Sequence, residues 1–253
     1  MSSNKLQKIL AQAGLGSRRS MEKKILKGTI KINEKIANLG DRVSPKDKIV
    51  VDGKPLIYYS SIILRKPRII IYYKPAGQIC TKKDPENRQS VFDALPNLNK
   101  KTRWVMVGRL DINTLGLLIF TTDSELANRL MHPAYEVKRE YIVRVFGKLS
   151  PEQIKLLING IVLKDGLAQF QSIYRLGGQG RNTWYRVTLS EGKNREIHRI
   201  FEVLNLQVSR LIRVSYGNIQ LPRYLSSGEW EELPLDFFNI VRKSVKMKSF
   251  KKY

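Results

Sequence analysis

The residues best suited to chemistry lie in Val105–Phe120, where two short apolar runs enclose a polar turn. The turn contains Arg109 and Asp111, with Gly108 and Gly116 at its ends. Buried strands on both sides would fix such a turn, and a carboxylate fixed in this way can act on a ligand. The two glycines allow backbone angles or close approaches that a Cβ would block. Asp111 is therefore our candidate catalytic residue, although aspartate in a turn often only bonds its own backbone.

Composition limits the classes of protein that this chain can belong to. Its 253 residues and 42% hydrophobic content suffice for two domains, and 46 Lys and Arg against 22 Asp and Glu give a net charge of +24. Such a charge predicts a polyanionic partner. No apolar run reaches the roughly 20 residues that a membrane span needs, and the first residues lack the apolar segment of a signal peptide. The single cysteine, Cys80, favours a cytoplasmic protein.

The first fifth of the chain predicts a small basic module. Apolar spacing indicates a helix over residues 6–13, and Ser17 is a suitable N-cap for a second helix that continues to Lys27. Short strands are expected at residues 29–32 and 49–51. The exposed sides of the helices would carry six cations, which we take as candidate RNA-binding residues: Lys5, Lys8, Arg18, Arg19, Lys23 and Lys24. The alternative is an ordinary solvated basic surface.

Several further elements are expected downstream. A strand over residues 68–73 leads into a Lys74-Pro75-Ala76-Gly77 turn, and Asp123 should cap a helix over residues 124–131. In the alternating stretch 137–145, Tyr141 points to the apolar side, where a core tyrosine is the alternative to a functional one. A capping box at Ser150 begins another helix. The glycine-rich segment 177–182 reads as a flexible loop that faces RNA.

The stretch from Glu191 to Phe201 combines an apolar helical stripe with cations. Arg195 and Arg199 are four residues apart and share one helix face, and His198 directly precedes Arg199. The other histidine, His132, reads as a helix-end residue. From Arg242 onward the chain is basic without an acidic residue, and we interpret this part as a disordered tail that adds non-specific RNA affinity.

Two of these segments resemble known families. The sequence Gly-Arg-Leu-Asp-Ile-Asn-Thr-Leu-Gly-Leu-Leu at 108–118, with its continuation through residue 133, resembles the signature of the pseudouridine synthases, in the branch that acts on ribosomal RNA. The N-terminal module resembles the alpha-L RNA-binding domain. The resemblance implies an α+β fold with a mixed, mainly antiparallel catalytic sheet. The expected domains are an RNA-binding domain at 1–60, a linker at 61–67, a catalytic domain at 68–240 and a basic tail at 241–253.

The resemblance also implies roles for residues. Asp111 becomes the catalytic nucleophile or base, Arg109 fills the space that a flipped nucleotide leaves, and Tyr141 stacks on the target base. Lys74, in a turn similar to the family's Lys-Pro-x-Gly turn, and Arg195 are expected to contact RNA. A cation should accompany Asp111. The family usually has Arg or Lys at the position of His198, so either His198 or Arg199 is expected to serve.

The implied reaction is the isomerisation of uridine to pseudouridine at a specific site in 23S ribosomal RNA of the large subunit. It needs no cofactor and no metal, because no group is donated and nothing is oxidised. We expect a monomeric cytoplasmic enzyme that binds an rRNA stem-loop. One rival is the same chemistry on small-subunit rRNA, and another is a non-catalytic ribosome-assembly factor that binds rRNA.

Overall fold

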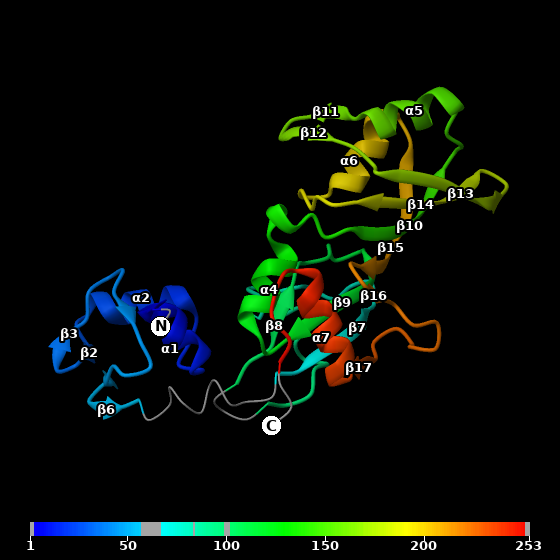
Figure 1. Ribbon diagram of the computed structural model, residues 1–253. Helices are drawn as coiled ribbons and strands as arrows, with labels where there is room; N and C mark the ends of the chain where they lie inside the picture. Colours follow the sequence, from blue (N-terminus) through cyan, green and yellow to red (C-terminus); the bar gives the residue numbers. More distant parts are fainter. Residues whose placement is uncertain (1–2, 57–66, 83, 99–101, 251–253) are drawn as a thin grey trace. The chain divides into compact units, whose positions relative to one another are not determined.

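The computed structural model describes residues 3–56, 67–82, 84–98 and 102–250 (Figure 1). Contacts between Cα atoms divide the chain into two compact units. The first comprises residues 1–67 and 97–104, and the second comprises residues 68–96 and 105–253. Each unit is described by itself below. Most of the expected linker 61–67 lies outside the described residues.

The first unit contains two helices and short strands. Helices α1 (Leu6–Gln12) and α2 (Arg18–Leu26) form as expected, and the Ser17 hydroxyl accepts a hydrogen bond from the Ser20 N–H. A four-stranded sheet has the order β3-β2-β5-β6, and β1 pairs with β4. The strands are β1 (Asn4–Lys5), β2 (Ile30–Ile32), β3 (Lys35–Ile36), β4 (Arg42–Val43), β5 (Ile49–Val51) and β6 (Lys54–Pro55). Apolar side chains from both helices and from the strands form a single core.

The second unit is built on a nine-stranded sheet with the path β13-β14-β10-β15-β9-β7-β17, to which β8 and β16 add at β9 and β15. Every pairing is antiparallel except β15 with β9, as expected for a mixed, mainly antiparallel sheet. Its strands are β7 (Ile69–Lys74), β8 (Val105–Val107), β9 (Leu115–Thr121), β10 (Arg139–Phe146), β13 (Ser172–Gln179), β14 (Asn182–Leu189), β15 (Gln207–Tyr216), β16 (Ile219–Gln220) and β17 (Trp230–Glu232).

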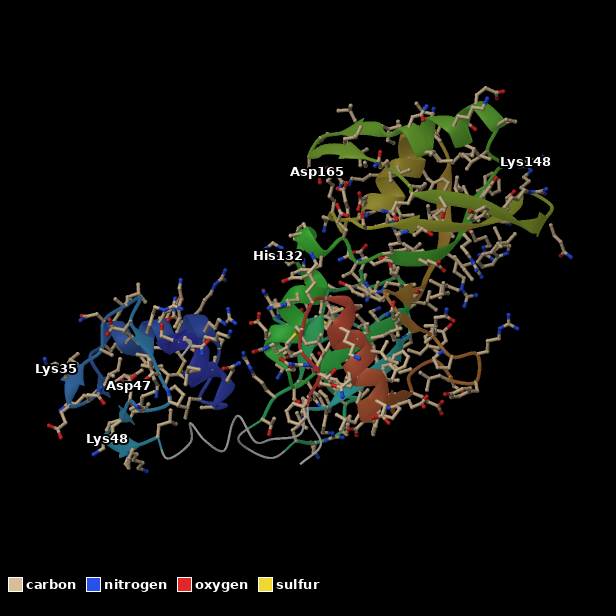
Figure 2. The ribbon with its side chains drawn as sticks, in the orientation of Figure 1. Lys35, Asp47, Lys48, His132, Lys148 and Asp165 are labelled. Atoms are coloured by element: carbon tan, nitrogen blue, oxygen red, sulfur yellow. The ribbon has the colours of Figure 1, made fainter. Side chains whose placement is uncertain are left out.

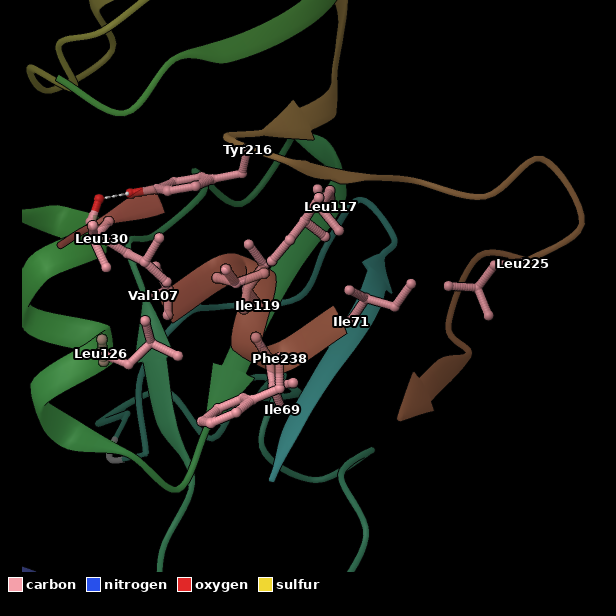
Figure 3. Packing of buried hydrophobic residues seen from close by; sticks show 14 residues of the cluster. Ile69, Ile71, Val107, Leu117, Ile119, Leu126, Leu130, Tyr216, Leu225 and Phe238 are labelled. Carbon is pink, nitrogen blue, oxygen red and sulfur yellow. Dashed lines mark hydrogen bonds between the residues drawn. The ribbon is translucent and has the colours of Figure 1, made fainter. Parts of the chain in front are cut away.

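Helices cover the two halves of this sheet. On the β7–β9 half, α4 (Ser124–Met131) and α7 (Leu235–Ser244) close a core that includes Ile71, Ile119 and Phe238 (Figure 3). The other half carries α5 (Pro151–Asn159), α6 (Glu196–Val203) and the hairpin of β11 (Ile161–Leu163) with β12 (Gly166–Ala168). A short 3-10 helix, η1 (Pro133–Tyr135), follows α4. The expected caps at Asp123 and Ser150 are both present.

Two expectations about flexible segments are wrong. The basic tail is not disordered over residues 242–250: Arg242 lies in α7 and forms an ion pair with Asp123, and Val245 is fully buried. Apolar residues in the tail pack on the core and hold it there, so the expected boundary at residue 240 cuts through a helix. The segment 177–182 is not a loop either, because β13 continues to Gln179 and β14 begins at Asn182.

Candidate active site

One row of residues crosses four strands of the large sheet. Lys74 on β7 is opposite Gly116 on β9, Gly116 is opposite Arg213 on β15, and Arg213 is opposite Tyr141 on β10. Residues directly opposite each other in a sheet point to the same face. Lys74, Arg213 and Tyr141 are all buried. The row therefore places two cations and a tyrosine, which are far apart in the sequence, side by side.

Glycine is required where the turn between β8 and β9 meets this row. A Cβ on Gly116 would lie 2.2 Å from the Arg213 carbonyl oxygen, and its φ is +104°. Gly108, at the other end of the turn, has φ +72° and lies over the side chains of Tyr216 and Arg213. Both glycines therefore have the positions that the sequence predicted for them. The close approach of β9 to β15 fixes the end of the turn.

Lys74 anchors the turn from below. Its Nζ donates hydrogen bonds to the carbonyl oxygens of Pro75, Ile112 and Thr114 at 2.9, 3.0 and 3.0 Å. The Gly77 N–H also donates to Ile112, at 2.8 Å. Burial lowers the pKa of Lys74, while Cys80 and Asp111 act in the opposite direction. The prediction that Lys74 faces RNA phosphates is wrong, because its side chain is fully buried and all three donors are used inside the protein.

Asp111 is held by its backbone, and its carboxylate remains available. Its carbonyl oxygen accepts from the Thr114 N–H at 3.0 Å, and the neighbouring Leu110 N–H points to the Cys80 sulfur at 3.5 Å. The half-buried carboxylate has no hydrogen bond or ion pair with any residue that the structure describes. Arg109 is exposed next to it. Because its oxygens accept no hydrogen bond from the described residues, the carboxylate is available to interact with a substrate.

The structure distinguishes between the two cations expected beside Asp111. Arg199 forms a two-point ion pair with Asp165, at 2.7 and 2.9 Å, in the turn between β11 and β12 (Asp165 is labelled in Figure 2). In the structure Arg199 therefore pairs with Asp165 and not with Asp111. Arg195 is exposed and pairs with Glu202 at 3.3 Å.

His198 is the remaining candidate for the cation beside Asp111. It lies half-buried in α6, and its Nδ1 is buried without a hydrogen-bond partner in the described chain. Burial lowers the pKa of His198 and Arg195 lowers it further, whereas Asp111 and Glu202 act in the opposite direction. His198 thus lies within the electrostatic reach of Asp111. His132 is not part of the site: it ends α4 and its Nδ1 accepts from the Ala134 N–H.

Arg213 is a site residue that sequence reasoning missed. Its Nε donates to the Leu117 carbonyl oxygen at 2.8 Å, and its guanidinium lies 5.2 Å from the centre of the Tyr216 ring. One terminal nitrogen, Nη2, is buried and has no partner among the described residues. A signal was available, because Arg210 and Arg213 are three apart in a strand and so must face opposite sides. Where one face of the sheet is covered, one of the two arginines must be buried.

The candidate RNA-binding cations of the first unit are at its surface. Lys5 precedes α1, and Arg18, Arg19 and Lys23 are exposed on α2. Lys24 forms an ion pair with Asp52, and Lys8 is half-buried on α1. The exposed members therefore form a basic helical surface of the kind that binds a phosphate backbone.

Comparison with known proteins defines the class. Residues 68–203 match the RNA pseudouridylate synthase family, and residues 5–49 match the S4 domain family. The chain therefore belongs to the RNA pseudouridylate synthases, and both resemblances drawn from the sequence are confirmed. A crystal structure of a pseudouridylate synthase has the same fold, with a TM-score of 0.64 at 21% identity over 94% of this chain and 99% of that one.

Particular relatives match over nearly the whole chain. Ribosomal large subunit pseudouridine synthase B of Yersinia pestis is 53% identical over 96% of this chain and 76% of its own length. The protein of the same name from Escherichia coli K12 is also 53% identical, over 97% of this chain and 84% of its own length. Among the described residues, no helix is long and apolar enough to cross a membrane.

Proposed function

We propose that this protein converts a specific uridine of large-subunit (23S) ribosomal RNA into pseudouridine, with Asp111 as the catalytic nucleophile or base. The observation that carries this proposal is the unpaired Asp111 carboxylate on a turn fixed by Lys74 and Gly116. The names of its 53% identical relatives support the large subunit as the source of the substrate. All of the proposed catalytic groups lie in one compact unit, so we expect a monomer to suffice.

The reaction breaks the bond from N1 of uracil to C1′ of the ribose and forms a bond from C5 to the same C1′. Positive character develops on the sugar as the first bond breaks, and a carboxylate beside it is stabilising, as in glycoside hydrolysis. Asp111 would either attack C1′, forming a bond that breaks when C5 bonds to C1′, or remove a proton from C2′ and return it as C5 bonds to C1′. The freed uracil turns, C5 bonds to C1′, and the C5 proton is lost while N1 gains a proton. The composition of the nucleotide is unchanged, because the proton that C5 loses to solvent is balanced by the proton that N1 gains.

Neighbouring residues would prepare the nucleotide for this step. Flipping a uridine out of its stack costs a few kcal/mol. Arg109, exposed next to Asp111, would take the vacated space and contact phosphate. Tyr141 would stack on the flipped uracil, which is worth about 1–3 kcal/mol and offsets much of that cost. Tyr141 is 8% exposed, so little of it meets solvent before RNA binds. His198 would supply positive charge to Asp111 when it is protonated.

The direct test is tritium release from uridine labelled at C5 in an rRNA fragment. The wild type should release tritium, and Asp111→Asn should not, because the amide can neither attack nor accept the proton. Glu34→Gln, which changes an exposed carboxylate in the turn between β2 and β3, should release at the wild-type rate. Equal release by Asp111→Asn and the wild type would remove Asp111 from the mechanism.

A second measurement addresses the two rivals. Pseudouridines are mapped in the ribosomal RNA of a strain that lacks this protein and of the same strain complemented with it. We expect one or a few positions in 23S rRNA to lose the modification. Loss confined to small-subunit rRNA would replace the proposed substrate, and no loss at all would favour the non-catalytic assembly factor.

A further inference from the structure

The half of the sheet formed by β10, β13, β14 and β15 has one covered face and one open face. Helices α5 and α6 contact β13 and β15, and Figure 1 shows both helices on the same side of β13 and β14. Tyr141, Val143 and Val145 of β10 are buried on the covered side. The residues that alternate with them point the other way. The open face is therefore the reverse of the face that carries Tyr141 and Arg213.

Cations and aromatic rings occupy this open face in two adjacent rows. The first row has Arg144 opposite both Trp184 on β14 and Arg210 on β15. In the second row, Arg186 on β14 is opposite Tyr174 on β13. We call these five residues the rear surface. Tyr174 is 62% exposed, and Arg186 and Arg210 are exposed. Three guanidinium groups and two rings therefore share one uncovered patch.

The cations of the rear surface have no acidic partner among the described residues. Neither Arg186 nor Arg210 forms an ion pair with any described residue. Arg144 donates its Nε to the Ser209 hydroxyl at 2.9 Å, and its guanidinium lies 5.6 Å from the centre of the Trp184 ring. An arginine stacked beside a ring in this way presents a flat, charged surface. The rear surface thus places positive charges without an ion-pair partner among the described residues next to the aromatic rings of Tyr174 and Trp184.

A pocket of about 420 Å³ adjoins the rear surface at the turn between β13 and β14. Phe146, two residues beyond Arg144 on the same face of β10, lines it together with Lys148 and Arg181, and we call these three residues the hairpin pocket. Arg175 also lines the pocket, but from the covered face, because it is opposite Tyr185. Lys148 is labelled in Figure 2. The lining of the pocket contains no acidic residue. The Arg181 guanidinium lies 6.0 Å from the centre of the Phe146 ring. The volume is that of a small-ligand pocket.

We propose that the rear surface and the hairpin pocket form a second RNA-binding surface, which takes single-stranded RNA outside the nucleotides held at the active site. Guanidinium groups bind phosphates, and exposed rings stack on bases of any sequence, so this combination fits a single strand. Arginine and aromatic residues are also common at protein interfaces, but three arginines without an acidic partner among the described residues, on a chain of net charge +24, favour a polyanion. The proposal deepens the proposed function, on which it rests only for its assumption that the substrate is RNA.

The consequence for the enzyme is a dependence on RNA length. A strand held at both places is bound twice by one protein, and the second contact is made at high effective concentration. An RNA too short to pass from one face of the sheet to the other gains nothing from the rear surface. Loss of the rear surface should therefore lower the affinity for long RNAs more than the affinity for a minimal stem-loop.

The test measures RNA affinity by fluorescence anisotropy, in the full chain carrying Asp111→Asn so that turnover does not intervene. The probe is a labelled oligouridylate of about 12 nucleotides, within the site sizes of single-strand binders. Arg186→Gln with Arg210→Gln should weaken binding about five- to tenfold at about 0.1 M salt and lower the salt slope by about 1.4. Tyr174→Ala should also weaken binding, and Tyr174→Phe should restore it because the ring is kept.

The matched control is Lys155→Gln with Lys243→Gln, which removes two exposed charges from α5 and α7. Equal losses in the two double variants, or no loss in either, would overturn the proposal. Photo-crosslinking with 4-thiouridine RNA should label the peptides that contain Tyr174 and Trp184, and crosslinks confined to α2 and the Asp111 turn would also overturn it. If the variants bind RNA as the wild type does but no longer bind a ribosomal protein, the partner of the rear surface is a protein and the proposal is overturned. Failure of tritium release would sink the proposed catalysis and leave these binding results unaffected.

Discussion

Burial changes what a charged residue can do, and the site contains three examples. Lys74 cannot reach RNA because its ammonium group bonds three carbonyl oxygens beneath the Asp111 turn. Arg213 is equally buried and has one donor unused. The pKa of His198 is lowered by burial, so it is mostly neutral at neutral pH. At the scale of the residue, position in the fold therefore decides the role more than residue type does.

We predict that tritium release depends on the protonation of His198. Because burial lowers the pKa of His198 below its usual value, the cationic form grows only as the pH falls. Wild-type release should increase from about pH 8 to about pH 6, whereas His198→Arg should be flat over this range because arginine stays charged. Rate profiles of the two proteins measure this. A flat wild-type profile would show that the neutral imidazole serves.

Lys74→Met should damage both stability and catalysis. The substitution removes the donor that the carbonyl oxygens of Pro75, Ile112 and Thr114 share, and the Thr114 bond is fully buried. We expect the free energy of unfolding to fall by about 2–4 kcal/mol in urea denaturation. The folded fraction should release tritium about 100-fold more slowly, because the turn is no longer fixed. The exposed Lys35→Met is the control, and a Lys74→Met protein as stable and active as this control would contradict the anchoring role.

At the scale of elements, the parallel contact of β9 with β15 is the junction between the two halves of the large sheet. It is short, with Leu115 opposite Ile212 and Gly116 opposite Arg213. The junction determines where the Asp111 turn lies relative to Tyr141, because the strands to each side are antiparallel neighbours in fixed register. A change at this point moves one half of the site against the other.

Gly116→Ala should be more destabilising than a usual glycine substitution. The added Cβ would lie 2.2 Å from the Arg213 carbonyl oxygen. The backbone must move to relieve this clash. We expect a loss of more than about 3 kcal/mol in thermal or urea unfolding. Gly177→Ala is the control with a similar positive φ and no atom within 4 Å of the added carbon, and it should cost about 1 kcal/mol. Similar losses in both variants would mean that strain in φ, and not the close approach, is decisive.

The order of the C-terminal segment should depend on Arg242. Its guanidinium pairs with Asp123, which also caps α4 by accepting from the N–H groups of Glu125 and Leu126. Arg242→Gln should lower stability by about 1–3 kcal/mol, since both side chains are 15% exposed. Hydrogen exchange in residues 242–250 should also become faster. The neighbouring exposed Lys243→Gln should change neither, and equal exchange in both variants would show that apolar packing alone orders the segment.

At the scale of the whole molecule, charge is the dominant property. A net charge of +24 spread over an S4 domain and a catalytic domain gives every RNA a strong non-specific attraction. Such an attraction does not distinguish one sequence from another, so specificity must come from contacts with bases and from the shape of the RNA.

The basic surface of α2 should make a measurable share of this attraction. Replacing Arg18, Arg19 and Lys23 by glutamine should lower the slope of log affinity against log salt by about 2. Each phosphate contact to single-stranded RNA contributes about 0.7 to this slope. Filter binding over a series of salt concentrations measures it. The control removes three exposed lysines from the strands and turns of the same unit, Lys31, Lys35 and Lys48 (the last two are labelled in Figure 2). An equal change in slope would mean that α2 is not a defined RNA-binding surface.

The local elements and the family could be predicted from the order of the residues alone. The caps at Ser17, Asp123 and Ser150 and the glycines around Asp111 depend on interactions within a few residues, which a single sequence displays. Helix α7 and the ordered tail were missed because apolar contacts with distant residues, and not local pattern, hold them. The tertiary structure decided that Lys74 is an anchor, that Arg199 binds Asp165, and that Arg213 lies beside Tyr141. Each of these depends on strand register or packing between segments far apart in the chain, and no spacing within one segment encodes such pairing.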